Sequence, residues 1–284
     1  MTIEQITVAG SGTMGRGIAY LALLGGYHAV LYDIDPRALE AAKSAIEATF
    51  KTEVEKGKLD AETARASLER LELSTDLEAS ARQANVIVEA IPETFQLKKE
   101  FFSQVDLFCG EETILASNTS SLSITELAGA VERRDRFIGL HFFNPPHRMK
   151  LLEIVVGERT SEATLEDAKR LAVRMGKDSI VVRDSPGFAT SRLGIALGVE
   201  AIRMLEDGVA SAQDIDRAME LGYNHPMGPL KLTDIVGLDV RLAIAEYLAS
   251  RLGPRFEPPQ LLRRMVEEGK LGKKSGAGFY EWNE

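Results

Sequence analysis

The stretch VAGSGTMGRGIA, residues 8–19, decides the fold of this chain. It places Gly10, Gly12 and Gly15 in the spacing Gly-x-Gly-x-x-Gly, after one strand-like run and at the start of an apolar helical run. The first glycine permits a tight turn, the second lets a pyrophosphate approach the backbone, and the third lets helix and strand pack closely. Amides at the start of that helix would then bind the phosphates.

An acidic residue completes this dinucleotide fingerprint. Asp33 ends the next strand-like run, where its carboxylate would accept hydrogen bonds from the adenosine ribose 2′-hydroxyl, whereas a 2′-phosphate would meet a like charge. The sequence therefore predicts NAD as the cofactor. The alternative, a glycine-rich turn without a ligand, leaves the register of strand, turn, helix and acid unexplained. The residues expected to bind the cofactor here are Gly10, Gly12, Thr13, Met14, Gly15 and Asp33.

Strand-like and helical segments alternate along the chain after the fingerprint. This alternation predicts an α/β fold with a Rossmann-type, doubly wound, mostly parallel sheet. Residues 37–70 read as two helices broken at Gly57, which predicts a helical hairpin inserted in the sheet domain. The expected later strands lie at residues 71–76, 84–91, 113–118, 136–143, 150–157 and 179–184.

The pattern changes at Asp184-Ser185-Pro186-Gly187, after which helical periodicity continues without a convincing strand. We therefore expect an NAD-binding domain at residues 1–184 and an all-α C-terminal domain at residues 185–284. The apolar positions of these helices are read as core, although some could form a subunit interface.

Composition narrows the class of protein. The net charge of −9 and the lack of a basic stripe disfavour a nucleic-acid binder. One cysteine, Cys109, precludes an internal disulfide, and there is no apolar run of membrane-spanning length and no signal-peptide pattern. We expect a soluble cytoplasmic protein without a metal site or a membrane partner.

The stretch GLHFFNPPHRMKLLEIV, residues 139–155, places His141 and Glu153 in two apolar runs on either side of a Pro-Pro turn. Their symmetric spacing suits a hairpin, so the late strands are expected to run antiparallel. An NAD enzyme that oxidises an alcohol needs a base, and a buried carboxylate needs a partner. His141 could be that base and Glu153 its orienting partner. A purely structural His–Glu pair explains the spacing equally well.

The whole chain resembles the 3-hydroxyacyl-CoA dehydrogenase family, especially its short bacterial 3-hydroxybutyryl-CoA members. The matching stretches extend from the fingerprint to the C-terminal end of the chain. They are VAGSGTMGRGIA, VIVEAIPE, ILASNTSSLSITELA, RFIGLHFFNPPHRMKLLEIV, DSPGFATSRL, HPMGPLKLTDIVGLD and GKKSGAGFYEW.

The resemblance implies oxidation of a short-chain (S)-3-hydroxyacyl-CoA by NAD, with His141 as the catalytic base and Glu153 as its partner. It implies that Ser120 contacts the 3-oxygen of the substrate and that Lys51, on the helical hairpin, contacts CoA, whose phosphates suit a cation. It further implies a homodimer formed through the C-terminal domain. The residues implied to lie beside NAD are Glu93, Lys98, Asn118, Asn144 and Lys274.

One position departs from the family pattern. In the family run GF-x-x-Asn-Arg the asparagine helps to hold the reacting oxygen, whereas this chain has Ser191 in its place, in GFATSR. The shorter hydroxyl puts the preferred substrate in doubt. Two alternatives therefore stay open: an NAD-dependent sugar-acid dehydrogenase of the gulonate type, and a non-enzymatic, crystallin-like NAD-binding relative.

Overall fold

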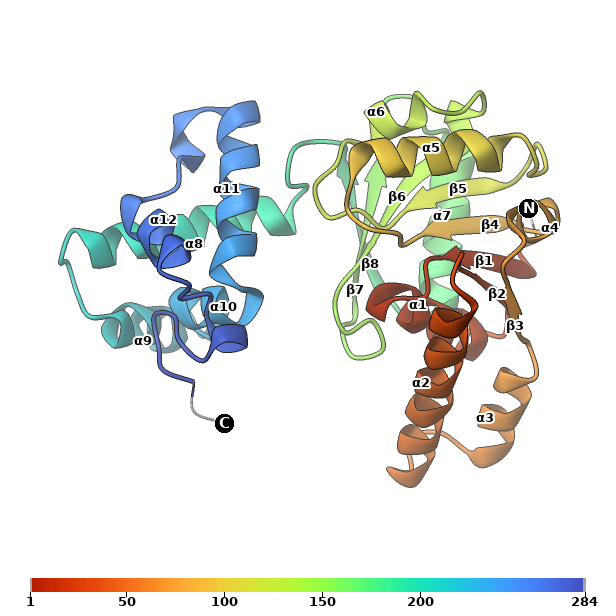
Figure 1. The fold of residues 1–284 in the computed structure, drawn as a ribbon, viewed down its shortest axis with the longest axis horizontal. Coiled ribbons are helices and arrows are strands. Elements are labelled where there is room, and N and C mark those ends of the chain that lie inside the picture. Colours follow the sequence, from red (N-terminus) through yellow and green to blue (C-terminus); the bar gives the residue numbers. More distant parts are fainter. Residues whose placement is uncertain (1, 283–284) are drawn as a thin grey trace. The chain divides into compact units, whose positions relative to one another are not determined.

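The computed structural model describes residues 2–282 and divides the chain into two compact units. The first unit ends at Asp184 and the second begins at Ser185. Within the described residues, the first unit holds one eight-stranded sheet and the second holds helices (Figure 1).

The sheet of the first unit has the strand order β3-β2-β1-β4-β5-β6-β7-β8. The first six of these strands run parallel to one another, β7 runs antiparallel to β6, and β8 runs parallel to β7. The prediction of a mostly parallel Rossmann-type sheet with antiparallel late strands is therefore confirmed. The strands are β1 (Gln5–Ala9), β2 (His28–Tyr32), β3 (Leu71–Ser74), β4 (Val86–Glu89), β5 (Ile114–Ser117), β6 (Phe137–Phe142), β7 (Leu151–Val156) and β8 (Asp178–Arg183).

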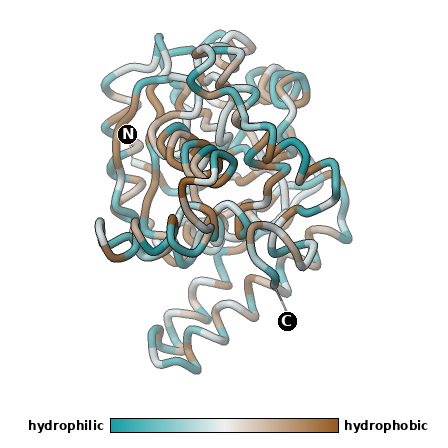
Figure 2. Tube along the Cα trace, turned by 90° about the vertical axis from the view of Figure 1, so that its left-hand side faces the viewer, coloured by the Kyte–Doolittle hydropathy of each residue, from teal (hydrophilic) through white to brown (hydrophobic). Residues whose placement is uncertain are grey.

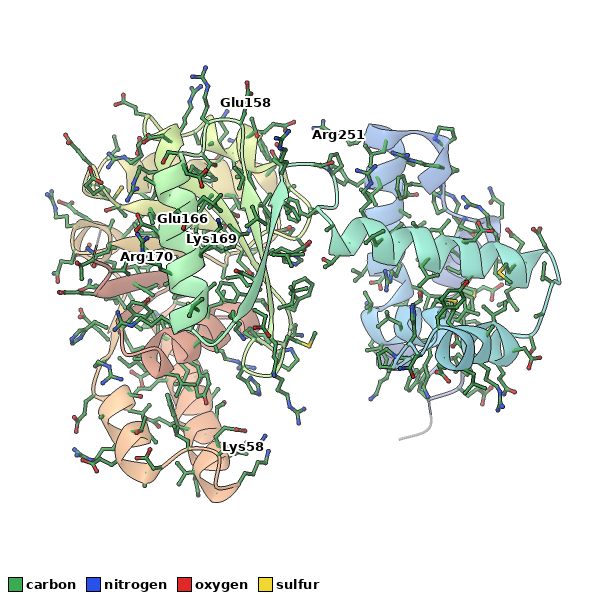
Figure 3. All side chains as sticks on the ribbon, turned by 180° about the vertical axis from the view of Figure 1, so that it is seen from behind. Lys58, Glu158, Glu166, Lys169, Arg170 and Arg251 are labelled. Atoms are coloured by element: carbon green, nitrogen blue, oxygen red, sulfur yellow. The ribbon has the colours of Figure 1, made fainter. Side chains whose placement is uncertain are left out.

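Helices cover both faces of this sheet. Side chains of α1 (Thr13–Leu24) and α7 (Glu162–Arg174) join one large core cluster with the strands. The other face carries α4 (Leu77–Arg82), α5 (Phe95–Asp106) and α6 (Ile124–Ala128), and the ring of Phe102 on α5 lies 4.7 Å from that of Phe137 on β6. Figure 3 shows Glu166, Lys169 and Arg170 on the outer side of α7, so this helix is amphipathic, as a helix covering a sheet must be.

The predicted helical hairpin is formed by α2 (Pro36–Glu55) and α3 (Ala61–Leu68), which project from the sheet (Figures 1 and 2). Gly57 has a φ of +68° in the connection, a conformation that favours glycine. The side chain of Phe50 on α2 is fully buried, and its ring lies 4.5 Å from that of Tyr20 on α1. Lys58, by contrast, extends into solvent at the tip of the hairpin (Figure 3).

The second unit consists of helices, and its described residues contain isolated β-bridges but no strand. The prediction of an all-α C-terminal region is confirmed. Asp234, fully buried on α10, accepts hydrogen bonds from the amides of Phe279 and Tyr280 and from the indole of Trp282, which holds the C-terminal segment in place. The helices are α8 (Thr190–Glu206), α9 (Ala212–Gly222), α10 (Pro229–Val236), α11 (Leu238–Leu252) and α12 (Gln260–Glu267).

Candidate active site

Two of the three fingerprint glycines, Gly10 and Gly15, meet steric needs that no other residue satisfies. Gly10 has a φ of +96°, and a Cβ there would lie 2.6 Å from the carbonyl oxygen of Ala90. A Cβ at Gly15 would lie 1.7 Å from the carbonyl oxygen of Gly10. Gly12 precedes the first residue of α1, Thr13, and the space beside it is open. The open side of Gly12 and the start of α1 are therefore suited to receive a pyrophosphate.

The carboxylate of Asp33, directly after β2, accepts hydrogen bonds from the amide of Ser11 at 2.8 Å and from its hydroxyl at 2.7 Å. Burial acts to raise the pKa of Asp33, but these bonds and one from the amide of Asp35 hold that pKa below its usual value. The negatively charged carboxylate of Asp33 therefore lies beside the glycine turn, as the sequence predicts.

His141 on β6 and Glu153 on β7 are direct partners in the antiparallel ladder. The Nδ1 atom of His141 lies 2.7 Å from Oε2 of Glu153, and their side chains are 9% and 0% exposed. Because a carboxylate accepts, Nδ1 carries the proton in this bond, and Nε2 is then the nitrogen that accepts a proton in the neutral imidazole. This arrangement would suit a base that is oriented by a carboxylate.

Side chains after β5 and before β8 form hydrogen bonds with the end of β6 and with the Pro-Pro turn. Asn118 follows β5, and its Oδ1 accepts a hydrogen bond from the amide of Phe142 at the end of β6. Asn144 follows β6 and is exposed. The buried ammonium of Lys177, which directly precedes β8, donates hydrogen bonds to the carbonyls of Pro146 and Met149 and so holds the turn in place. Burial lowers the pKa of Lys177.

Ser120 lies in the loop after β5, where its amide donates to Oε1 of Glu93 at 3.0 Å. The other oxygen of Glu93 lies 3.1 Å from the ammonium of Lys98, which is 1% exposed. Lys98 in turn lies 2.5 Å from a carboxylate that the sequence analysis missed, Glu89, the last residue of β4. The signal for Glu89 was present, since an acid in the apolar run VIVEAI is as unusual as Glu153 in its own run.

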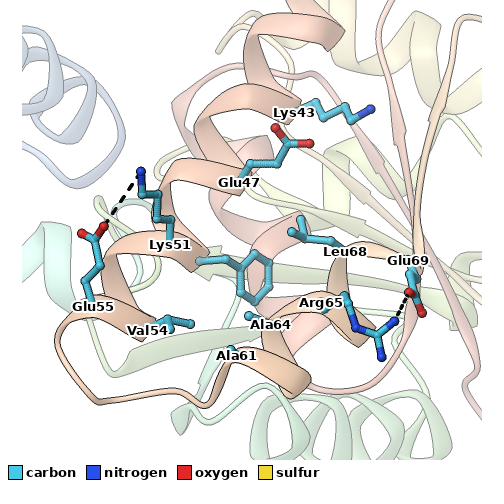
Figure 4. Close-up of a pocket in the computed structure, with 11 residues that line it drawn as sticks. Lys43, Glu47, Lys51, Val54, Glu55, Ala61, Ala64, Arg65, Leu68 and Glu69 are labelled. Carbon is cyan, nitrogen blue, oxygen red and sulfur yellow. Dashed lines mark hydrogen bonds and ion pairs between the residues drawn. The ribbon is translucent and has the colours of Figure 1, made fainter.

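The helical hairpin carries the predicted CoA-contacting lysine on a groove between its two helices. Figure 4 shows this α2–α3 groove, of about 560 Å³; Lys51 is one of its lining residues, and its ammonium points to Glu55, 3.9 Å away, on the side of α2 remote from α3. The groove is lined by apolar residues and charged ones, namely Phe50, Val54, Ala61, Ala64 and Leu68 with Lys43, Glu47, Lys51, Glu55, Arg65 and Glu69.

A second, smaller cleft lies between α1, α2 and the Pro-Pro turn, and its lining includes Arg16, Thr49 and His147. Burial lowers the pKa of His147, and the positive charges of Arg148, Lys177 and Lys56 lower it further. The sequence does not reveal this cleft, because its residues come from three separate segments.

Two of the predicted site residues belong to the second unit. Ser191 is the second residue of α8. The ammonium of Lys274, in a short 3-10 turn, lies 2.6 Å from the carboxylate of Asp239. Across residues 2–282, no cluster of three or more His, Cys, Asp or Glu side chains is arranged to hold a metal, and no helix is long and apolar enough to span a membrane.

Comparisons with known proteins cover both units. The family model for the "3-hydroxyacyl-CoA dehydrogenase, NAD binding domain" matches residues 5–185, and the model for the C-terminal domain of that family matches residues 187–282. The "Probable 3-hydroxybutyryl-CoA dehydrogenase" of Bacillus subtilis is 45% identical over 100% of this chain and 99% of its own length. The mitochondrial hydroxyacyl-coenzyme A dehydrogenase of Sus scrofa is 41% identical over 99% of this chain and 91% of its own length.

A solved structure of a related enzyme is similar to this chain over its whole length. The crystal structure of (S)-3-hydroxybutyryl-CoA dehydrogenase from Ralstonia eutropha superposes with a TM-score of 0.97 at 38% identity, covering 100% of both chains. The first unit thus matches a domain described as NAD-binding, which fits the open glycine turn and the charged Asp33 found there. From the two family models and the full-length relatives it follows that this chain belongs to the 3-hydroxyacyl-CoA dehydrogenase family.

Proposed function

We propose that the protein oxidises short-chain (S)-3-hydroxyacyl-CoA, with 3-hydroxybutyryl-CoA as the expected substrate, and reduces acetoacetyl-CoA in the reverse direction. The observation that carries the proposal is the buried pair of His141 and Glu153 at the carboxyl end of β6. Ligands of doubly wound sheets bind outside the carboxyl ends of the strands, so this base lies at the edge where a substrate arrives.

In the proposed mechanism Nε2 of His141 takes the proton of the 3-hydroxyl group. Glu153 keeps the other ring nitrogen protonated and stabilises the imidazolium that forms. Ser120 contacts the 3-oxygen, and Asn144 and Ser191 are proposed to help place it. NAD, when bound, accepts the hydride that leaves C3 of the substrate. In the reverse direction His141 returns the proton to the alkoxide oxygen.

The fingerprint residues of the glycine turn, including Thr13 and Met14, are proposed to bind the pyrophosphate, and Asp33 to select NAD over NADP. A 2′-phosphate would stand beside a carboxylate that stays charged at neutral pH. The further proposed NAD contacts are Glu93, Lys98, Asn118, Asn144 and Lys274.

CoA is proposed to bind along the helical hairpin. Lys51 supplies one cation there, at the α2–α3 groove. The cleft beside the Pro-Pro turn is lined by Arg16 and His147, and the charges of Arg148 and Lys56 act on His147 together with that of Glu53, which opposes them. CoA carries phosphates that favour such cations. Substitutions of Lys51, on α2, and of Lys56, directly after α2, distinguish the two surfaces experimentally.

We also propose a cytoplasmic homodimer that assembles through the second unit. Arg241 on α11 is 8% exposed, its Nε atom makes no hydrogen bond within residues 2–282, and burial lowers its pKa to about 10. A buried unpaired charge is costly, so an acceptor from a second copy would relieve it. Exposed apolar side chains gather on α8, α10 and α11, and they are Leu193, Leu232, Ile235, Val236 and Val240.

The test is NADH oxidation followed at 340 nm with acetoacetyl-CoA, beside an NADPH control and an assay of gulonate with NAD. Fast NADH oxidation with acetoacetyl-CoA is expected. Turnover of gulonate without activity on acetoacetyl-CoA would replace the proposed substrate, and inactivity in every assay would favour a non-enzymatic role.

A further inference from the structure

Three charged side chains meet at the carboxyl ends of β4 and β5. Nζ of Lys98 lies 2.5 Å from Oε1 of Glu89 and 3.1 Å from Oε2 of Glu93. The side chains of Lys98 and Glu89 are 1% and 0% exposed, whereas that of Glu93 is 41% exposed. One buried ammonium thus joins a carboxylate deep in the sheet to a carboxylate at its edge.

The deep carboxylate is fully engaged. Oε1 of Glu89 accepts from the amide of Ile91 at 2.8 Å, and Oε2 accepts from the hydroxyl of Ser117 at 2.6 Å. A buried ion pair is tolerated only with such additional bonds, and removing one partner leaves an uncompensated charge. Burial raises the pKa of Glu89, but Lys98 and these donors oppose that rise. Glu89 therefore fixes Lys98 at one position.

The edge carboxylate holds the loop that carries Ser120. Oε1 of Glu93 accepts from the hydroxyl of Thr119 at 2.5 Å and from the amide of Ser120 at 3.0 Å. The hydroxyl of Thr119 also accepts from the amide of Leu122 at 3.0 Å, which closes the turn. Burial acts to raise the pKa of Glu93, but Lys98 and these donors hold it below its usual value, so the acceptor stays charged.

We propose that Glu89 is a positioning residue of the reaction, acting through Lys98 and Glu93 to set the orientation of the Ser120 hydroxyl. Glu89 is too deeply buried to touch a substrate. Its carboxylate keeps Lys98 from moving, Lys98 keeps Glu93 in place, and Glu93 fixes the backbone amide from which the Ser120 side chain extends. The inference rests on the proposed function, because it assigns Ser120 to the 3-oxygen of the substrate.

The experiment is a double-mutant cycle with Glu89→Gln and Ser120→Ala, measured with NADH and acetoacetyl-CoA. Glu89→Gln is expected to lower kcat about tenfold or more, the scale on which misplaced groups slow a reaction. The rates are measured at saturating NADH, because Lys98 and Glu93 are also proposed NAD contacts. In the Ser120→Ala background the same change is expected to cost no further activity, because its effect passes through Ser120. Independent, multiplying losses would overturn the inference.

A matched control separates positioning from stability. Asp106, at the other end of α5, pairs with Arg133 at 2.7 Å, and Asp106→Asn should lower Tm but leave kcat unchanged. Amide hydrogen exchange gives a readout without turnover: exchange at Ser120 should be faster in Glu89→Gln than in the parent protein. Unchanged exchange would overturn the inference even if the parent enzyme were inactive on acetoacetyl-CoA, a result that would separately reject the proposed function.

Discussion

His141 and Glu153 face each other across two antiparallel strands, with Nδ1 and Oε2 2.7 Å apart and both side chains buried. The pairing depends on register, because a slip of one residue would turn one of the two side chains to the opposite face of the sheet. The Pro-Pro turn, held by Lys177, lies between the two strands and helps to keep that register.

His141→Gln is expected to lower kcat by about 10²–10⁴-fold, the usual contribution of a general base, and to leave the Kd for NADH nearly unchanged. Steady-state rates with acetoacetyl-CoA and fluorescence titration of NADH measure the two quantities. His28→Gln is the control, because His28 is exposed at the start of β2, the strand end remote from the ligand edge. Full turnover by His141→Gln would reject the assigned base.

Asp33→Ser is expected to shift cofactor use toward NADPH, with a rise of about tenfold in the ratio of kcat/KM for NADPH to that for NADH, because a like charge is removed. The pKa of Asp33 is lowered in the folded protein, so its charge is complete at every pH above the unfolded value of about 4 and is lost only as pH falls further. The preference of the parent enzyme for NADH should therefore be constant from pH 7 to pH 9, where the 2′-phosphate of NADPH, with a second pKa of about 6, is also mostly in its fully charged form. A preference that changes within that range would mean that another group selects the cofactor.

The sequence predicted most of the fold because its signals are local. The glycine spacing and the alternation of strands and helices specify the sheet, and Gly57 marks the hairpin. The short helices α4 and α6 were not predicted, since six and five residues are too few to show a helical period. Polar residues before these helices still serve as caps: Asp76 accepts a hydrogen bond from the amide of Ala79, and the hydroxyl of Ser123 accepts one from the amide of Glu126.

Spacing in the sequence predicted a pair of interacting site residues only where both residues lie on one hairpin. His141 and Glu153 lie on one hairpin, so their spacing reveals the pair. Glu89 ends a strand and Lys98 lies on the helix that follows, nine residues later, so the apolar run VIVEAI shows a buried carboxylate but not which residue pairs with it. The position of the CoA contact could not be predicted for the same reason. Side chains five residues apart on a helix point about 140° apart, and the sequence does not say whether the side of Lys51 or that of Lys56 meets the substrate.

Lys56→Ala is expected to raise KM for acetoacetyl-CoA about fivefold or more with little change in kcat, because a phosphate contact contributes to binding equally in ground and transition states. Lys51→Ala, five residues earlier on α2, is the matched comparison. Equal increases would place CoA across both surfaces of α2. If only Lys51→Ala raises KM, the α2–α3 groove is the contact and the cleft beside the Pro-Pro turn is not.

Arg241→Met tests the proposed dimer. If a second copy supplies an acceptor, the variant loses that contact, and its dimer should dissociate at protein concentrations at which the parent remains dimeric, as measured by sedimentation velocity. If nothing pairs with Arg241, replacing an unpaired buried charge with an apolar side chain should raise Tm without changing the assembly. Arg264→Met, at an exposed position on α12, controls for the loss of one positive charge.

Ser191→Asn restores the residue found in the family pattern at the second position of α8. An amide extends further than a hydroxyl and presents two donors, so it should hold the reacting oxygen more firmly and raise kcat on acetoacetyl-CoA by about threefold to tenfold. Thr190→Asn, one residue earlier, is the control for adding an amide to this helix end. A fall in kcat/KM for Ser191→Asn, with the control unaffected, would mean that the rest of the pocket is adapted to serine and that its preferred substrate differs from acetoacetyl-CoA.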